Sequence, residues 1–505
     1  MGNTNELLLG VDLGTSGTTG VLVRPDGEVV AQAEKDHEVS LPRPGWVEHH
    51  AEEDWWGGFV AVCSELLHQA EGPVAAVCIS GIGPCLLPAG EDGRPLRPGI
   101  LYGVDTRATR EVGELTEEYG NEKIMEVCGN PLTAQSVGPK IAWLRRNEPG
   151  VWDETHYMLM GHTFVAYRLT GEYVLDHPSA SMCDPLYCVG EHAWIEEWAE
   201  EVAPGLELPD LRWPAEVAGV VTREAAEATG LPEGIPVAVG TNDGVAEARS
   251  VGVRNPGDLM LMYATTMATL EVVEEVLATP SLWSIAGLSK GTNALFAAMS
   301  TSGALTEWVK KLSDGKSFEE LTEEARGVPP GSDGLVVLPY FAGERTPISD
   351  PDARGVLCGL TLSHGRGHLY RAMLEATAFG ARHLFESMRE AGGRAERLVA
   401  VGGGTKGGLW TQIVSDVIGE VQELPEQTVG AAYGAALLAG IASGLVEEEA
   451  DWSRIVATVD PDPENREVYE ELYAIYKDLY PATRDQVHAL AKMQTQAGEG
   501  AEGAT

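Results

Sequence analysis

The feature that most constrains this chain is an apolar segment that ends in an aspartate and is followed by a polar, glycine-rich turn. Residues 7–11 are apolar, which is typical of a buried strand, and Asp12 ends the run. Three glycines and four hydroxyl residues follow within the next eight positions, and a second apolar run covers residues 20–23. The pattern predicts a strand, a turn and a strand, rather than the strand, loop and helix of a Walker-type phosphate loop.

The chemistry available in this turn suits a phosphate group and a metal ion. The turn contains no lysine, which a Walker-type loop requires. Its backbone N–H groups and hydroxyls can still bind phosphate oxygens, and a carboxylate at a strand end can hold Mg²⁺ while the ion keeps several waters. A simple hairpin turn without a ligand is the alternative interpretation of this segment on its own.

Three further polar segments follow predicted strands. Residues 236–246 contain a strand, the sequence Gly-Thr-Asn-Asp and a helix of small residues. Asp243 stands at the start of this helix, where it is either a helix cap or a general base. Residues 258–272 repeat the strand, hydroxyl-rich turn and strand, so we interpret them as an echo of residues 7–23 in a duplicated fold. Residues 402–408 are a glycine cluster between a strand and a helix, which together favour phosphate or nucleotide binding.

Length and charge exclude several classes of protein. The 505 residues predict two large domains. The 77 acidic side chains outnumber 35 basic ones, and the formal net charge of −42 disfavours nucleic-acid and anionic-membrane partners. We interpret the charge as adaptation to the salt-rich cytoplasm of a halophile, with an acidic interaction protein as the alternative. Scattered cysteines, a polar start and the lack of a long apolar run predict a cytoplasmic protein with reduced thiols and neither leader nor membrane span.

Three charged residues are candidates for a second ligand. Asp105 and Arg107 follow an apolar strand, and they either line a polyol site or pair with each other on the surface. Lys140 opens a helix after a Gly-Pro turn, and it either binds substrate or pairs with a surface acid.

Taken in chain order, six motifs resemble those of the FGGY family of carbohydrate kinases, within the actin and hexokinase-like ATPase superfamily. They are residues 12–19, 105–107, 240–243, 264–266, 343–347 and 402–416. The resemblance covers residues 7–445 and implies an α/β protein with two ribonuclease-H-like (actin-like ATPase) domains and a nucleotide cleft between them. It also implies ATP-dependent transfer of the γ-phosphoryl group to a sugar hydroxyl, with ATP and Mg²⁺ as cofactors, and we expect a small-molecule sugar as partner and a homodimer.

The resemblance divides the chain and assigns roles to its residues. Residues 1–253 become an N-terminal domain that binds sugar and carries the first phosphate loop, residues 254–445 a C-terminal ATP-binding domain, and residues 446–505 a helical tail. Asp243 is then the catalytic base and Asp12 the Mg²⁺-side carboxylate, acting through water. The expected nucleotide and phosphate contacts are Thr15, Ser16, Thr265, Thr266, Gly303, Gly403, Gly404 and Thr405. The expected substrate contacts are Gly83, Asp105, Arg107, Lys140 and Asp243.

One departure from the family pattern concerns the sugar. Many members that act on xylulose carry Gln-Met-His-Gly where this chain has Gly81-Ile82-Gly83-Pro84. A pentose or ketopentose remains the first expectation by resemblance. Two alternatives stay open: a kinase of an already phosphorylated pentose such as ribose 1-phosphate, suggested by Lys140 and Arg107, and a catalytically inactive regulator that senses sugar or ATP.

Overall fold

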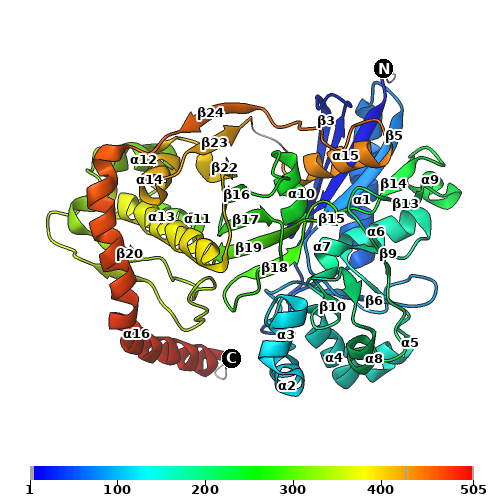
Figure 1. Ribbon diagram of the computed structural model, residues 1–505, viewed down its shortest axis with the longest axis horizontal. Coiled ribbons are helices and arrows are strands. Elements are labelled where there is room, and N and C mark those ends of the chain that lie inside the picture. The colour runs from blue at the N-terminus through cyan, green and yellow to red at the C-terminus, as the bar shows by residue number, and fades with distance from the viewer. Residues whose placement is uncertain (1–4, 427–428, 503–505) are drawn as a thin grey trace.

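The computed structural model describes residues 5–426 and 429–502. Two α/β domains lie side by side, and each is built on a mixed β-sheet (Figure 1). Seven strands belong to each of these sheets in the described part of the chain. The α/β architecture with two related domains, expected from the resemblance, is confirmed.

The first sheet has the spatial order β13-β14-β5-β1-β2-β3, and β15 also pairs with β5. Strands β1 and β2 are antiparallel, whereas β5 runs parallel to β1 and β15 runs parallel to β5. The strands are β1 (Leu7–Leu13), β2 (Gly17–Val23), β3 (Val29–Asp36), β5 (Val74–Gly81), β13 (Val217–Val220), β14 (Pro236–Ala238) and β15 (Thr241–Asn242).

The second sheet has the spatial order β18-β19-β17-β16-β22-β23-β24. Its β16 and β17 form an antiparallel hairpin, and β22 runs parallel to β16. The strands are β16 (Asp258–Tyr263), β17 (Met267–Val273), β18 (Trp283–Ala286), β19 (Asn293–Met299), β22 (Arg397–Val401), β23 (Gln422–Pro425) and β24 (Ile455–Val459).

The two sheets repeat one plan, as the sequence echo predicts. In each, a hairpin is extended by a parallel strand on the side of its first strand: β5 beside β1, and β22 beside β16. The short turns lie between Leu13 and Gly17 in one sheet and between Tyr263 and Met267 in the other. The strand, turn and strand predicted twice from sequence are therefore confirmed.

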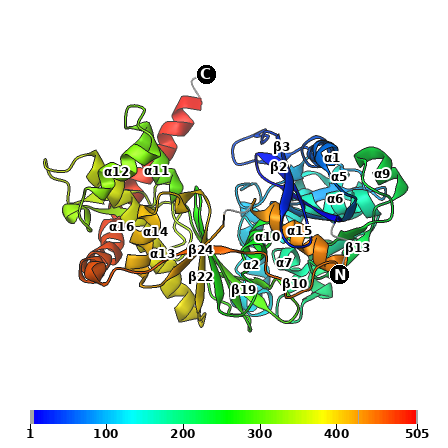
Figure 2. The same ribbon diagram turned by 90° about the horizontal axis from the view of Figure 1, so that it is seen from above.

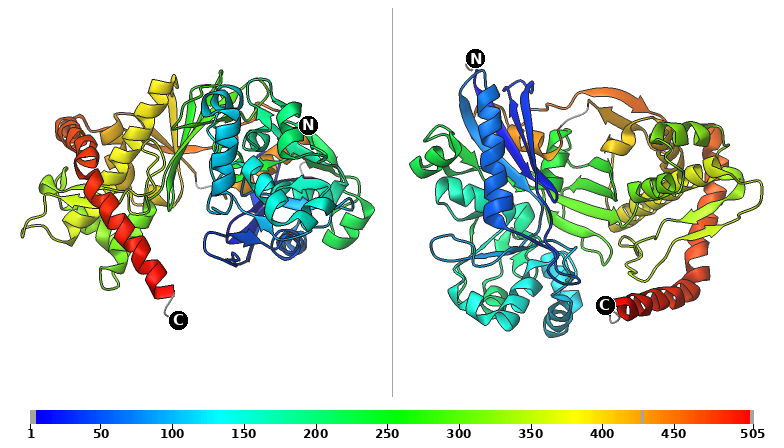
Figure 3. Two further views of the ribbon diagram at one scale, coloured as in Figure 1. Left: turned by 90° about the horizontal axis from the view of Figure 1, so that it is seen from below. Right: turned by 180° about the vertical axis from the view of Figure 1, so that it is seen from behind.

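Helices cover both faces of the first sheet. A π-helical turn (Ala51–Trp56) and α1 and α6 pack on one face, where Trp55, Phe59 and Phe164 are fully buried (Figure 3, right). A smaller helical region lies below the first sheet in Figure 1. The helices before the second sheet are α1 (Gly57–Gln69), α2 (Thr109–Tyr119), α3 (Asn121–Cys128), α4 (Val137–Asn147), α5 (Pro149–Glu154), α6 (Gly161–Thr170), α7 (His177–Ala180), α8 (Glu196–Val202), α9 (Arg223–Thr229) and α10 (Asp243–Ser250).

The second domain is built around a long buried helix, α13. Helix α16 runs beside α13 (Figure 2), and its Tyr469, Tyr473 and Tyr476 pack against Phe379 of α13. The helices after β19 are α11 (Gly303–Lys311), α12 (Phe318–Arg326), α13 (Arg366–Ala391), α14 (Leu409–Ile418), α15 (Ala431–Ala442) and α16 (Arg466–Glu502).

Two-stranded pairs complete the molecule: β4 (Glu48–His49) with β7 (Gly99–Ile100), β6 (Leu87–Ala89) with β8 (Tyr157–Leu159), β9 (Val174–Asp176) with β12 (Asp210–Arg212), β10 (Tyr187–Cys188) with β11 (Ala193–Trp194), and β20 (Val336–Leu338) with β21 (Val356–Cys358).

The division of the chain into domains differs from a cut by sequence position. Helix α15 falls in the segment that we expected in the C-terminal domain, yet it packs on β1 and β5 of the first sheet (Figure 1). The tail is also not wholly helical, because β24 joins the second sheet before α16 begins. The reason for the first difference is steric and apolar: the small residues of α15 fit closely against a glycine in β1.

The described residues contain no helix that is both long and apolar enough to span a bilayer. All seven cysteines are unpaired, and only Cys358 is fully exposed.

Replacing Gly10 with alanine tests the contact between β1 and α15. A Cβ atom on Gly10 would lie 2.0 Å from the Ala432 carbonyl oxygen and 2.3 Å from the Ala436 nitrogen. Because both obstacles are backbone atoms, we expect Gly10→Ala to lower the free energy of unfolding by about 1–3 kcal/mol or more, measured by thermal denaturation. Gly113→Ala, on an open part of α2 with no atom within 4 Å, is the control and should be neutral or slightly stabilising. Equal melting temperatures for Gly10→Ala and wild type would contradict the packing.

Candidate active site

Parallel strand pairing brings the first group of polar residues together. Asp12 pairs with Ser80 across β1 and β5, and Ser80 pairs with Thr241 across β5 and β15. The Ser80 hydroxyl donates to Asp12 Oδ1 at 2.8 Å. Asp243 follows β15 by one residue, so both aspartates lie at the carboxyl ends of neighbouring parallel strands, where α/β sheets bind ligands.

Asp243 is the first residue of α10, and it is not the cap of that helix. The cap is Asn242, whose side chain accepts a hydrogen bond from the Val245 N–H at 3.1 Å. The Asp243 carboxylate instead accepts the N–H of the next residue, Gly244, at 2.8 Å. Since Asn242 performs the capping role, the interpretation of Asp243 as a helix cap is wrong, and its carboxylate is left for another purpose.

Three carboxyl groups at this place have raised pKa values. Burial raises the pKa of Asp12 to about 6. Burial, together with the negative charge of Asp12, raises the pKa of Asp243 to about 7. The same two causes raise the pKa of Glu247, one helical turn further along α10, to about 7. A carboxylate with a pKa near 7 suits a general base that works at neutral pH.

These carboxyl groups fit a divalent cation that retains part of its water shell. Buried like charges favour either a bound proton or a bound cation. The described residues hold no cluster of three or more histidine, cysteine, aspartate or glutamate side chains with the geometry of a complete metal site. Mg²⁺ is commonly held by one carboxylate among waters and phosphate oxygens, and Asp12 is a carboxylate of the kind that this arrangement needs.

The turn between β1 and β2 carries the next expected contacts. The turn is closed by a hydrogen bond from the Gly14 N–H to the Gly17 carbonyl at 2.8 Å. The Thr15 hydroxyl lies 3.2 Å from the Tyr102 hydroxyl, and the Thr15 carbonyl lies 3.1 Å from a ring nitrogen of His49. Ser16 is exposed. Thr15 is thus held in place from both sides, which leaves the turn preformed.

The corresponding turn of the second domain is seated on the start of α11. The N–H groups of Gly303 and Ala304 donate to the carbonyls of Ala264 and Thr265 at 2.9 and 3.1 Å. A Cβ atom on Gly303 would lie 2.5 Å from the Ala264 oxygen, so glycine is required for this approach. Thr265 is exposed and Thr266 half-buried. Met267 is fully buried as the first residue of β17.

The glycine cluster follows β22, which runs parallel to β16. Gly402 has φ of +93°, and a Cβ atom there would lie 2.5 Å from the Tyr263 oxygen. Gly403 is exposed, with open space where its Cβ would be, whereas Gly404 lies against the Trp410 ring. The Thr405 hydroxyl donates to the Gly402 carbonyl at 2.9 Å. The cluster thus lies at the same sheet edge as the turn at residues 264–266.

Helix α10 links the two groups of residues. Its apolar side chains Val245 and Ala248, with Val251 just after the helix, pack into one core with Met260 and Leu270 of the second sheet. The same helix packs closely with α15 on the first sheet. Asp243, at the start of α10, therefore lies where the two domains meet (Figure 1).

Asp105 and Arg107 are paired with each other inside the protein. The Arg107 guanidinium donates to Asp105 Oδ2 at 2.6 Å, forms an ion pair with Glu48 at 2.8 Å and stacks over the rings of Trp46 and Trp143. The side chains of Asp105 and Arg107 have no exposed surface. The pairing alternative is therefore observed, but in the interior rather than on the surface.

Lys140 is buried too, and its partners are not acids. Its ammonium group donates to the backbone carbonyls of Ala134 and Gln135 at 2.7 and 3.3 Å. Burial lowers the pKa of Lys140 to about 8. Gly83, the remaining expected substrate contact, is half-buried, and a Cβ atom on it would lie 3.3 Å from Cβ of Asn242, next to Asp243. Among the expected substrate contacts, Gly83 and Asp243 are thus adjacent. The other three, Asp105, Arg107 and Lys140, are buried and bonded to protein groups in the interior.

Sequence reasoning missed three polar residues at this place. Ser80 and Tyr102 carried no motif, and only the strand pairing puts them beside Asp12 and Thr15. Glu247 had a usable signal, because it stands four positions after Asp243 in a predicted helix and so shares its face.

Removal of the Arg107 charge tests whether this cluster is structural. Arg107→Leu would leave Asp105 buried without its ionic partner, so we expect the free energy of unfolding to fall by about 3–5 kcal/mol in a denaturant titration. Arg110→Leu is the matched control, because Arg110 forms an exposed ion pair with Glu114, and should cost about 1 kcal/mol or less. Equal stability losses for the two variants would contradict a structural role for the buried pair.

Comparison with known protein families matches both halves of the chain. Residues 7–249 match the N-terminal domain, and residues 261–443 the C-terminal domain, of the FGGY family of carbohydrate kinases. The two matches together span both groups of site residues described above.

Individual relatives extend over nearly the whole chain. The xylulose kinase of Bacillus subtilis (strain 168) is 29% identical over 502 residues, which is 96% of this chain and 99% of that protein. The xylulose kinase of Escherichia coli (strain K12) is 30% identical over 454 residues, covering 86% of this chain and 90% of that protein. The crystal structure of xylulose kinase from Rhodospirillum rubrum superposes with a TM-score of 0.89 at 32% identity, covering 95% of this chain and 100% of that one. The chain therefore belongs to the FGGY family of carbohydrate kinases and is an ATP-dependent sugar kinase.

Proposed function

We propose that this kinase phosphorylates a ketopentose, xylulose, with MgATP as the phosphoryl donor. The support for the sugar is the similarity, over almost the full length, to proteins described as xylulose kinases. The support for the chemistry is the position of Asp243, a carboxylate with a raised pKa at the start of a helix that contacts both domains. That position is the observation on which the proposal chiefly depends.

In the proposed reaction, a hydroxyl oxygen of the sugar attacks the γ-phosphorus of ATP. The bond from that oxygen to phosphorus forms while the bond to the β–γ bridging oxygen breaks, and ADP leaves with the electron pair. Asp243 accepts the hydroxyl proton. Because phosphoryl transfer depends mainly on positioning and charge neutralisation, one base and well-placed phosphate contacts suffice.

The remaining site residues take supporting roles in this proposal. Asp12, held by Ser80, would hold Mg²⁺ through water, and the ion when bound would supply charge neutralisation at the phosphates. Thr15 and Ser16 in the first turn, and Thr265 and Thr266 in the second, would contact the β- and γ-phosphates. Gly303, Gly403, Gly404 and Thr405 would form the nucleotide pocket, and Gly83 would line the sugar site beside Asp243.

The alternative substrate, an already phosphorylated pentose, loses its main support. It rested on Lys140 and Arg107 as free cations, yet both are engaged inside the protein. An inactive regulator is also not favoured, because the relatives that match over nearly the full length include several xylulose kinases and the carboxylates Asp12 and Asp243 are both present. A homodimer, a cytoplasmic location and adaptation to high salt remain predictions.

A substrate screen tests the sugar directly. ADP release in the presence of MgATP would be followed across ketopentoses, aldoses, polyols and pentose 1-phosphates, in low and in molar KCl. We expect the largest kcat/KM for xylulose, because nothing in the described sugar-side residues offers a free cation for a substrate phosphate. Preferential turnover of a pentose 1-phosphate would contradict the proposed substrate while leaving the kinase assignment intact.

Substitution of the base tests the role of Asp243. Asp243→Asn keeps the side-chain shape and removes the proton acceptor, so we expect kcat to fall by about 10²–10⁴-fold. The affinity for MgATP, measured by calorimetry, should stay within a few fold. Asp153→Asn, at an exposed position on α5, is the matched control and should leave both quantities unchanged. If Asp243→Asn retained a large share of the wild-type kcat, another group would have to be the base.

A further inference from the structure

The proposed chemistry needs a positive charge that the two phosphate turns do not supply. The transferred phosphoryl group is anionic, and Asp12, Asp243 and Glu247 add carboxyl groups around it. Neither the turn at residues 12–19 nor the turn at residues 263–267 contains a lysine or arginine. A cation fixed elsewhere in the fold would therefore have a defined task.

Arg345 lies beside the second phosphate turn. Its guanidinium donates to the carbonyl of Met299 at 3.0 Å. Met299 ends β19 and pairs with Met267, the residue that directly follows Thr266. The backbone that continues from Met299 also holds this turn, because the Ser302 N–H donates to the Thr265 carbonyl at 3.0 Å. Arg345 is thus one strand away from Thr265 and Thr266, the threonines expected to contact phosphate. It is also solvent-exposed.

The charge of Arg345 also acts on a residue of the first domain. Its charge acts on the hydroxyl of Tyr102 and lowers the pKa of that group against the larger raising effect of burial. The charge of Asp243 acts on the same hydroxyl. Tyr102 in turn lies 3.2 Å from the Thr15 hydroxyl in the first phosphate turn. The charges of Arg345 and Asp243 thus both act on a hydroxyl that lies beside Thr15.

The loop that carries Arg345 is anchored at several points. We call residues 344–350 the arginine loop. Glu344 is buried, and its carboxylate accepts the N–H groups of Ser300 and Arg345 at 2.7 and 2.8 Å. The backbones of Glu344 and Asp350 exchange two hydrogen bonds, of 2.9 and 2.8 Å, which close the base of the loop.

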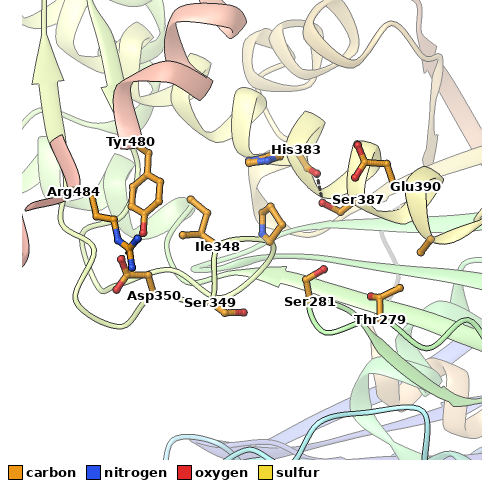
Figure 4. Close-up of a pocket in the computed structure, with 12 residues that line it drawn as sticks. Thr279, Ser281, Ile348, Ser349, Asp350, His383, Ser387, Glu390, Tyr480 and Arg484 are labelled. Carbon is orange, nitrogen blue, oxygen red and sulfur yellow. Dashed lines mark hydrogen bonds between the residues drawn. The ribbon is translucent and has the colours of Figure 1, made fainter. Parts of the chain in front are cut away.

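Helix α16 holds the other end of the arginine loop. The Asp350 carboxylate accepts hydrogen bonds from the Tyr480 hydroxyl and from a ring nitrogen of His488, the latter at 2.7 Å. Figure 4 shows Tyr480 and Asp350 side by side, on the wall of a hollow of about 590 Å³. Since the loop is fixed at both ends, the position of Arg345 is largely set before any ligand binds, which is the condition for effective electrostatic stabilisation.

We propose that Arg345 is a catalytic residue that contacts the transferred phosphoryl group and stabilises its charge during transfer. The proposal rests on the kinase function given above. It gives a role to Arg345, which lies in the motif at residues 343–347 but had no role assigned to it. An arginine suits the task, since its planar guanidinium presents several N–H donors to phosphate oxygens and stays charged at every working pH. The bonds that form and break are those already written for the reaction, and Arg345 neither gains nor loses a proton.

The test compares Arg345→Gln, Arg345→Lys and Arg345→Ala with the wild type. We expect Arg345→Gln to lower kcat by about 10³-fold or more, because catalytic arginines in phosphoryl transfer contribute about 10³–10⁵-fold. KM for the sugar and the affinity for MgADP should change by less than about threefold. Arg345→Lys should keep part of the rate, and added guanidinium ion should restore part of the rate of Arg345→Ala, which a merely structural arginine would not show.

A measurement without sugar separates this proposal from the choice of substrate. Aluminium fluoride with MgADP mimics the transferring phosphoryl group, and its extra binding over MgADP alone, measured by calorimetry, should be lost in Arg345→Gln. If wild-type protein fails to use xylulose but Arg345→Gln loses this extra binding, the proposed sugar is contradicted and the role of Arg345 is supported. Equal extra binding in wild type and Arg345→Gln would overturn the role of Arg345.

One further arginine variant and one lysine variant test whether the loss of kcat is specific to Arg345. Arg354→Gln removes a guanidinium just beyond the arginine loop, where it contacts the carbonyls of Pro351 and Ala353, and should leave kcat unchanged. Lys406→Gln removes the exposed cation of the glycine cluster. A loss of kcat in Lys406→Gln with none in Arg345→Gln would overturn the proposal, as would a higher sugar KM with unchanged kcat in Arg345→Gln.

Discussion

The pairing of β1 with β5, and of β5 with β15, fixes where the carboxylates of Asp12 and Asp243 meet. These parallel strands end at one edge of the first sheet, so residues far apart in the chain share a small volume. Holding like charges together away from water costs free energy, and the raised pKa values of both groups express that cost. Binding of a cation, or removal of a substrate proton, offsets it. In the proposed reaction, Asp243 would offset part of this cost by accepting the hydroxyl proton of the sugar.

The second domain completes the site through helix α10. This helix starts at Asp243, packs on β16 and β17 of the second sheet, and touches α15 on the first. The orientation of Asp243, the proposed base, therefore depends on both domains. The second domain contributes the turn at residues 264–266, the glycine cluster and the anchored loop with Arg345. Closure of two domains on a sugar would exclude water, which protects ATP from hydrolysis, and would bring these groups to their working distances.

Much of this arrangement could be predicted from local patterns, because each pattern has a local physical cause. The two hairpins, the helix after Asp243 and the glycine cluster follow from apolar runs, turn residues and helix starts. The burial of Arg107 and Lys140 could not be predicted, since it depends on which distant segments cover each side chain. Trp46 and Trp143 cover Arg107, and carbonyls of the preceding loop hold Lys140. Likewise, α15 packs on the first sheet because it fits closely against Gly10. This contact between distant segments could not be predicted from local sequence.

The pH dependence of kcat/KM tests most directly whether a buried carboxylate is the base. Asp243 accepts a proton only in its ionised form, and burial with the charge of Asp12 has raised its pKa to about 7. The account predicts that kcat/KM rises with pH, by about tenfold per unit in the acidic range, and levels off above about pH 7. A kcat/KM that is flat, or that falls, between about pH 5 and about pH 8 would contradict the account.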